Sequence, residues 1–122
     1  MEGYQSPFLG NEISCVMHGI DEGILNNSSE LEKSLLEALN EDKFTILEKA
    51  SHEFSPKGFT LMFLLAESHV SIHTYPEHHS LYFGLYSCRG EGDGIKTYES
   101  FKEKVKPISV DFIQRTIVVK TP

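Results

Sequence analysis

The chain has 122 residues, of which 39% are hydrophobic and 24% charged, as expected for one globular domain with a single core. Its formal net charge is −7 and its basic residues form no stripe, which argues against binding to nucleic-acid phosphates. No apolar run approaches the ~20 residues of a membrane span, and the first residues do not read as a signal peptide. We therefore expect one soluble, cytoplasmic domain over residues 1–122 that binds neither nucleic acid nor membrane.

The first part of the chain predicts a strand, a helix and a second strand. Hydrophobic side chains alternate within residues 11–20, as in a half-buried strand. Asn27 and Glu30 have the spacing of a capping box, and leucines follow at helical intervals, so a helix is predicted over residues 28–40. Residues 43–54 form a predicted strand that ends at the turn sequence SPKG.

The middle of the chain predicts three strands in succession. Residues 59–66 are a continuous hydrophobic run, which predicts a strand buried on both faces or nearly so. A short strand is predicted over residues 70–74 and is stopped by Pro76. Residues 80–88 are rich in aromatic side chains and predict a third strand.

The last part of the chain predicts a loop, a short helix and a closing strand. The glycines of RGEGDG (89–94) match no phosphate-binding fingerprint, so this segment is expected to be a turn. Tyr98, Phe101 and Val105 lie at helical spacing, and residues 108–120 alternate as a strand. This order of elements favours an α+β fold of two layers, a largely antiparallel sheet with two helices on one face. The other face is then solvated or covered by a second subunit.

Four histidines, His69, His73, His78 and His79, invite interpretation as a metal site. His69 and His73 have the four-residue spacing found in zinc-binding helices. Hydrophobic residues alternate with them, however, so this segment is expected to be a strand in which they lie about 13 Å apart. Two ligands that are each ~2.0–2.1 Å from one zinc ion cannot be so widely separated. We expect no metal.

Two cysteines and one serine are candidates for chemistry. Without a secretion signal, reduced thiols at Cys15 and Cys88 are favoured over a disulfide, and a small buried side chain is their ordinary role. Ser68 follows the apolar run, where its hydroxyl either hydrogen-bonds a neighbouring backbone group or reacts. No Gly-x-Ser-x-Gly elbow surrounds it. The residue pattern alone favours the structural role and leaves the reactive one open.

The stretch 54–88 resembles the short bacterial and archaeal type of S-adenosylmethionine decarboxylase, whose members make a pyruvoyl cofactor from an internal serine. The resemblance lies in AESHVSIHTYPE (66–77) and in LYSC (85–88), which follows at the matching distance. It implies that the chain cuts itself between Glu67 and Ser68. The products would be a β chain, 1–67, and an α chain, 68–122, that begins with the pyruvoyl group.

The resemblance also implies roles for individual residues in processing and catalysis. The Ser68 hydroxyl would attack the carbonyl of Glu67, assisted by Thr60, which stands where the family has a serine. His73 matches the histidine that transfers a proton during the elimination that follows, and histidine exchanges protons near neutral pH. The pyruvoyl ketone would bind the substrate amine as a Schiff base and draw electrons from it. Cys88 matches the catalytic proton donor.

The implied substrate is S-adenosylmethionine, whose decarboxylated form supplies spermidine synthesis. Phe54 and Tyr75 stand where relatives place aromatic rings around the adenine, and both offer a flat face for stacking. Glu77 matches a binding carboxylate. The short members of the family are homodimers of the processed protomer, with active sites that draw on both subunits, so we expect a homodimer.

Three positions depart from the family pattern and leave alternatives open. Asn11 and Glu12 replace a basic residue and a histidine that many members carry, and Gly84 stands where many have an acid. Relatives decarboxylate ornithine or arginine with the same group, and Glu12 is a candidate for the extra carboxylate that a diamino acid needs. A relative that is no longer processed and serves as a regulatory subunit is the other alternative.

Overall fold

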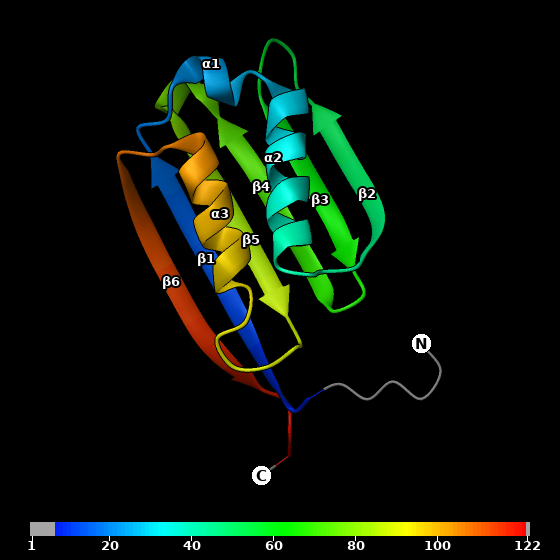
Figure 1. The fold of residues 1–122 in the computed structure, drawn as a ribbon. Coiled ribbons are helices and arrows are strands. Elements are labelled where there is room, and N and C mark those ends of the chain that lie inside the picture. The colour runs from blue at the N-terminus through cyan, green and yellow to red at the C-terminus, as the bar shows by residue number, and fades with distance from the viewer. Residues whose placement is uncertain (1–6, 122) are drawn as a thin grey trace.

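The computed structural model describes residues 7–121 and contains one six-stranded sheet in the order β2-β3-β4-β5-β1-β6, in which all neighbouring strands are antiparallel (Figure 1). The strands are β1 (Leu9–His18), β2 (Ile46–Glu53), β3 (Phe59–Leu65), β4 (Ser68–Tyr75), β5 (Ser80–Ser87) and β6 (Ser109–Val118). The helices are α1 (Glu22–Leu25), α2 (Ser28–Glu41), α3 (Ile95–Val105) and the short 3-10 helix η1 (Pro76–His78). The predicted α+β class is confirmed, as is the order of the six strands and the two long helices, whereas α1 and η1 are additional. The expectation that the first residues are not a signal peptide concerns residues 1–6 in part, and these lie outside the described residues.

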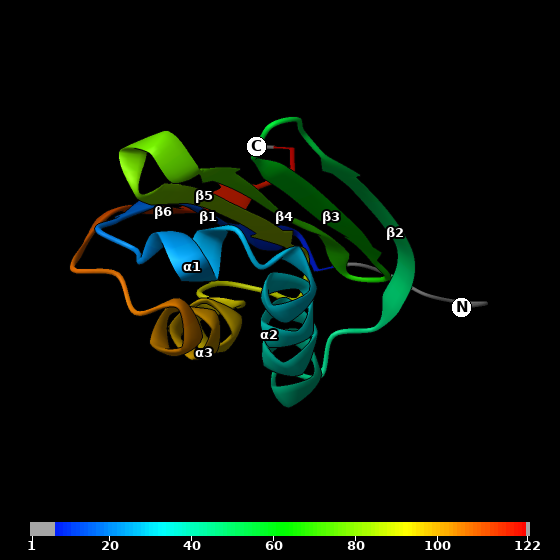
Figure 2. The same ribbon diagram turned by 90° about the horizontal axis from the view of Figure 1, so that it is seen from above.

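Helices α1, α2 and α3 all lie on one face of the sheet, and the core fills the space between the two layers (Figure 2). As predicted, α2 begins behind Asn27, whose side chain accepts a hydrogen bond from the Glu30 N–H at 3.2 Å. Its leucines Leu31, Leu35 and Leu39 are fully buried against the sheet. The four-residue helix α1 was not predicted, because it is too short to show a helical period.

The prediction that residues 59–66 are buried on both faces is wrong. Along β3, Leu61 and Phe63 are buried under the helices, whereas Met62 and Leu64 are 44% and 51% exposed on the opposite side. The run is continuous in hydrophobicity but alternating in burial. The sheet therefore has one helix-covered face and one open face that carries apolar side chains.

The strand after this run begins earlier than predicted. β4 starts at Ser68 instead of residue 70, because Ala66 and Glu67 form a two-residue turn that connects it directly to β3. Ser68 is thus the first residue of a strand and pairs with Leu65 on one side and Ser87 on the other. In the described part of the chain, no helix is long and apolar enough to cross a membrane.

Candidate active site

The turn at Glu67 and Ser68 lies beside the end of β5. The Glu67 carbonyl oxygen accepts a hydrogen bond from the Cys88 backbone N–H at 2.8 Å. Ser68 lies opposite Ser87, the residue before Cys88, in the β4–β5 register. The sheet therefore brings together three of the predicted site residues, Glu67, Ser68 and Cys88, at the end where β4 begins and β5 ends.

Thr45, which precedes β2 directly, binds this turn from the other side. Its backbone N–H and hydroxyl donate to the two carboxylate oxygens of Glu67, at 3.0 and 3.1 Å. Its carbonyl oxygen accepts the N–H of Ala66 at 2.9 Å. Thr45 was not predicted as a site residue, since nothing in the sequence around it indicates contact with a turn about 20 positions away.

The loop after Cys88 is held by an ion-pair cluster. The Arg89 guanidinium bonds the Asp93 carboxylate at 2.7 Å and Asp42, after α2, at 3.2 Å. Asp42 in turn accepts from the Thr97 N–H and hydroxyl at the start of α3. Burial lowers the pKa of Arg89, but the hydrogen bond and charge of Asp93, with the charges of Asp42 and Glu67, outweigh it and raise the pKa. The cluster ties the segment of Cys88 to both long helices.

A second group of predicted residues lies at the opposite end of the sheet. The Thr60 hydroxyl and the His73 Nδ1 are 3.0 Å apart on adjacent strands of the open face. The His73 ring also contacts the ring of Tyr82, with centroids 5.7 Å apart. Phe54 follows β2 and Tyr75 ends β4; their side chains are 53% and 46% exposed.

Glu77 belongs to this second group by position, since it lies in η1, directly after β4. Its side chain is exposed. The structure thus collects every predicted substrate-binding residue at the end of the sheet that holds Thr60 and His73. It leaves the predicted cleavage site at the other end.

The two groups are far apart within one chain. Ser68 and His73 are five positions apart in the same strand, which corresponds to roughly 16 Å at ~3.3 Å per residue. A proton cannot pass directly between groups at that separation, because proton transfer needs hydrogen-bond distance or one intervening water. One copy of the chain therefore does not bring His73 to Ser68.

Between the two groups, the open face holds a shallow hollow of about 180 Å³ over Gly84. A Cβ atom at Gly84 would lie 2.5 Å from the Tyr82 hydroxyl oxygen, so the absent side chain leaves the space that the Tyr82 ring occupies. The Tyr82 hydroxyl lies 3.4 Å from Ser14 Oγ. The Glu12 carboxylate at the rim accepts a hydrogen bond from Arg115 Nε at 2.8 Å, so its charge is paired.

Cys15 is placed in the core, in keeping with the ordinary role expected for it. Burial raises the pKa of its thiol to about 12, against a smaller opposing effect of a backbone hydrogen bond from Phe83. Within residues 7–121, the two cysteines form no disulfide. Across the same residues, no three His, Cys, Asp or Glu side chains are grouped closely enough to hold a metal ion.

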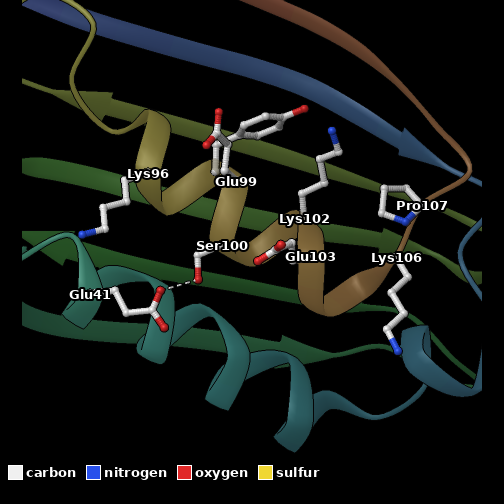
Figure 3. A pocket seen from close by; sticks show the side chains of 9 residues that line it. Glu41, Lys96, Glu99, Ser100, Lys102, Glu103, Lys106 and Pro107 are labelled. Carbon is white, nitrogen blue, oxygen red and sulfur yellow. Dashed lines mark hydrogen bonds between the residues drawn. The ribbon is translucent and has the colours of Figure 1, made fainter.

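A larger hollow of about 650 Å³ lies on the helical layer, away from both groups. Figure 3 shows its lining along α3 and the hydrogen bond from Ser100 to Glu41 of α2. None of the predicted site residues lines it; its lining residues are Glu41, Lys96, Tyr98, Glu99, Ser100, Lys102, Glu103, Lys106 and Pro107. This hollow is therefore separate from the predicted site residues.

Comparison with known proteins gives a consistent result. The family model for S-adenosylmethionine decarboxylase matches residues 11–116. The chain is 31% identical over 116 residues to the S-adenosylmethionine decarboxylase proenzyme of Sulfurihydrogenibium sp., covering 93% of this chain and 87% of the relative. It is 28% identical over 104 residues to the proenzyme of Picrophilus torridus, covering 85% and 80% of the two chains.

Solved structures agree with these sequence similarities. The adenosylmethionine decarboxylase of Aquifex aeolicus superposes with a TM-score of 0.82 at 27% identity, over 95% of this chain and 96% of that chain. A monomer of Trypanosoma brucei AdoMetDC is similar in fold, with a TM-score of 0.62 at 15% identity, over 85% of this chain but only 45% of that one.

Proposed function

The chain belongs to the S-adenosylmethionine decarboxylase family, and from that premise we propose that it is a self-processing, pyruvoyl-dependent decarboxylase of S-adenosylmethionine. Cleavage between Glu67 and Ser68 would give chains 1–67 and 68–122, and the product would supply spermidine synthesis in the cytoplasm. One observation carries the proposal. The carbonyl that must be attacked, that of Glu67, already accepts the Cys88 N–H at 2.8 Å.

That hydrogen bond suits the first step of cleavage. The Ser68 hydroxyl oxygen adds to the Glu67 carbonyl carbon, the C–N bond breaks, and the hydroxyl proton ends on the Ser68 nitrogen, so the amide becomes an ester. Negative charge develops on the Glu67 oxygen during the addition. The Cys88 N–H is already aimed at this oxygen and would stabilise the charge without reorganisation.

The second step removes the α-proton of Ser68 and breaks its ester bond, so that Glu67 leaves with a main-chain carboxylate as the new C-terminus. The remaining dehydroalanine then hydrolyses to a pyruvoyl group and ammonia. A base is needed for that proton, and His73 is the proposed one. Its Nδ1 is held by the Thr60 hydroxyl at 3.0 Å, and its ring lies against Tyr82. These contacts fix the orientation of the imidazole ring and therefore the direction in which its Nε2 atom points.

Decarboxylation uses the same end of the sheet as cleavage. A pyruvoyl group at position 68 would supply a ketone that withdraws electrons from the substrate as its carboxylate leaves. Cys88 is the proposed proton donor to the substrate carbon. The Arg89 cluster would keep that cysteine in place, since Arg89 joins its loop to Asp42 and Asp93.

Phe54, Tyr75 and Glu77 are the proposed substrate contacts. The two exposed rings offer faces for the adenine, and the carboxylate is available to ribose hydroxyls or to the sulfonium centre. Ornithine or arginine would instead need a carboxylate for the distal cation. Glu12 is paired with Arg115 at 2.8 Å, which makes it a poor receptor for that cation and favours S-adenosylmethionine.

We propose that two copies of the chain complete each site. The Glu67–Ser68–Cys88 group and the His73 group lie at opposite ends of the sheet, roughly 16 Å apart along β4. A two-fold axis that lies between two open faces and runs across their strands would set the first group of one copy against the second group of the other. Met62, Leu64 and Ile113, all exposed on this face, would be buried by the pairing.

The test is a denaturing intact mass of the purified protein together with carbon dioxide release. Wild type should appear as two fragments split between Glu67 and Ser68, and it should release carbon dioxide from S-adenosylmethionine in preference to ornithine or arginine. Ser68→Ala should stay whole and inactive. An uncut wild-type chain would refute the proposal in favour of a regulatory relative, and activity only on a diamino acid would refute the substrate.

A further inference from the structure

The Glu67 side chain accepts two hydrogen bonds from Thr45, which lies outside the sheet, directly before β2. We propose that Thr45 is a positioning residue for self-cleavage, which acts by holding Glu67 so that its carbonyl carbon stays within reach of the Ser68 hydroxyl. The proposal rests on the proposed function, since it concerns the same cleavage. It goes beyond it by assigning a role to Thr45 and to the Glu67 carboxylate.

The geometry restrains the turn on both sides. Thr45 donates its N–H and its hydroxyl to the two carboxylate oxygens of Glu67, at 3.0 and 3.1 Å, and accepts the Ala66 N–H at 2.9 Å. On the far side, the Glu67 carbonyl oxygen accepts the Cys88 N–H at 2.8 Å. The residue before the cut is therefore fixed through its side chain, its carbonyl and its neighbour.

Such restraint matters because the backbone of Ser68 is held in an unfavourable conformation. Its φ is +144°, a region that residues with a side chain rarely adopt and that persists only where the surroundings enforce it. A looser turn would let Ser68 relax and would withdraw its hydroxyl from the Glu67 carbonyl. Misplacement of reacting atoms by about 1 Å is enough to slow a reaction strongly.

The experiment measures the rate of cutting directly after synthesis. The proenzyme is made by cell-free translation, and loss of the uncut chain is followed on a denaturing gel. Thr45→Val keeps the shape of the side chain and the N–H bond but removes the hydroxyl, and it should slow cutting by about tenfold. Thr45→Ser keeps the hydroxyl and should cut at close to the wild-type rate.

Ser28→Ala is the matched control. The Ser28 hydroxyl also donates to an exposed carboxylate, that of Glu53, at 2.6 Å, but this pair lies outside the cleavage turn. Its removal should cost a similar amount of thermal stability and leave the cutting rate unchanged. Slowing confined to Thr45→Val, with rescue in Thr45→Ser, would support a positioning role.

Three outcomes would overturn the inference. If Thr45→Val cuts at the wild-type rate, the Thr45 hydroxyl has no role in cutting. If Thr45→Ser cuts slowly, retaining a hydroxyl at this position is not enough for cutting at the normal rate. Equal slowing by Ser28→Ala would show that lost stability, not position, sets the rate. A wild-type chain that never cuts would refute the proposed function itself, which separates that failure from the failure of Thr45 alone.

Discussion

Ser68, the proposed cleavage residue, has an unusual backbone conformation. Its φ of +144° places it in a region that glycine adopts readily and other residues do not. Conformations of this kind cost about 1–3 kcal/mol and concentrate at functional sites. The proposed cleavage would break the peptide bond on the N-terminal side of Ser68 and remove the restraint, so the uncut chain would be the strained form.

This strain can be measured in chains that cannot cut. Glycine in a strand is normally less stable than alanine by about 0.5–1 kcal/mol, because it loses more conformational freedom on folding. At position 68 we expect the reverse, with Ser68→Gly more stable than Ser68→Ala by about 1 kcal/mol, because only alanine retains the strain. Urea unfolding of the two uncut variants gives the difference.

Ser71 provides the control for this comparison, since it lies in the same strand and is absent from the positive-φ residues of the described chain. At position 71, Ser71→Gly should be less stable than Ser71→Ala by the usual amount of about 0.5–1 kcal/mol. If glycine is also the less stable residue at position 68, the strain at Ser68 is refuted.

The residues of the site differ in how far they could be predicted. Ser68, His73 and Cys88 were identified because they fall in a long sequence motif, and the structure places Ser68 and Cys88, but not His73, at one end of the sheet. Thr45 was missed because its role depends on a contact between a loop and a turn that are distant in sequence. No motif or periodicity around Thr45 indicates that contact.

Among the secondary-structure elements, prediction succeeded where hydrophobic residues repeated at helical spacing over several turns and a capping residue marked the boundary. Helix α2 was predicted to within one residue, because Asn27 caps it and three leucines face the core. β3 was misjudged because a hydrophobic run does not reveal whether its second face meets the same chain or another copy. The proposed pairing of two copies would bury Met62 and Leu64, which are exposed in the single chain.

The contact between β5 residues Gly84 and Tyr82 predicts an unusual substitution effect. A Cβ atom at position 84 would lie 2.5 Å from the Tyr82 hydroxyl oxygen and 3.0 Å from its ring, so Gly84→Ala must displace the ring. The displaced ring would leave His73, and overpacking of this kind costs about 1–3 kcal/mol. We expect Gly84→Ala to lower the free energy of unfolding and to slow cutting.

A double-mutant cycle isolates that contact. In a Tyr82→Ala chain there is no ring to displace, so Gly84→Ala should be neutral or slightly stabilising there, as alanine normally is in a strand. An equal cost in both backgrounds, measured by urea unfolding, would show that the Tyr82 ring is not the cause.

At the scale of the whole molecule, the sheet separates the proposed site residues into two groups. Antiparallel pairing of β3, β4 and β5 sends Glu67, Ser68 and Cys88 to one end and Thr60 and His73 to the other. The proposed pairing of two copies would bring these two groups together.

Mixed dimers give a direct test of this arrangement. Ser68→Ala has no nucleophile and His73→Ala no base, so neither variant should cut when it is expressed alone. When both are expressed together with tags of different mass, a mixed dimer has one complete site, made of Ser68 from the His73→Ala chain and His73 from the Ser68→Ala chain. Intact mass should therefore show cutting of the His73→Ala chain only.

The outcome of this mixing depends on which copy serves which site. Cutting by His73→Ala alone would show that the histidine is dispensable. Mixed dimers that co-purify but stay whole would show that Ser68 and His73 must belong to the same chain, which the separation of roughly 16 Å along β4 opposes. If cutting is restored only in the His73→Ala chain, which keeps Ser68, then each histidine acts on the serine of the other copy. The open faces of the two sheets must then meet.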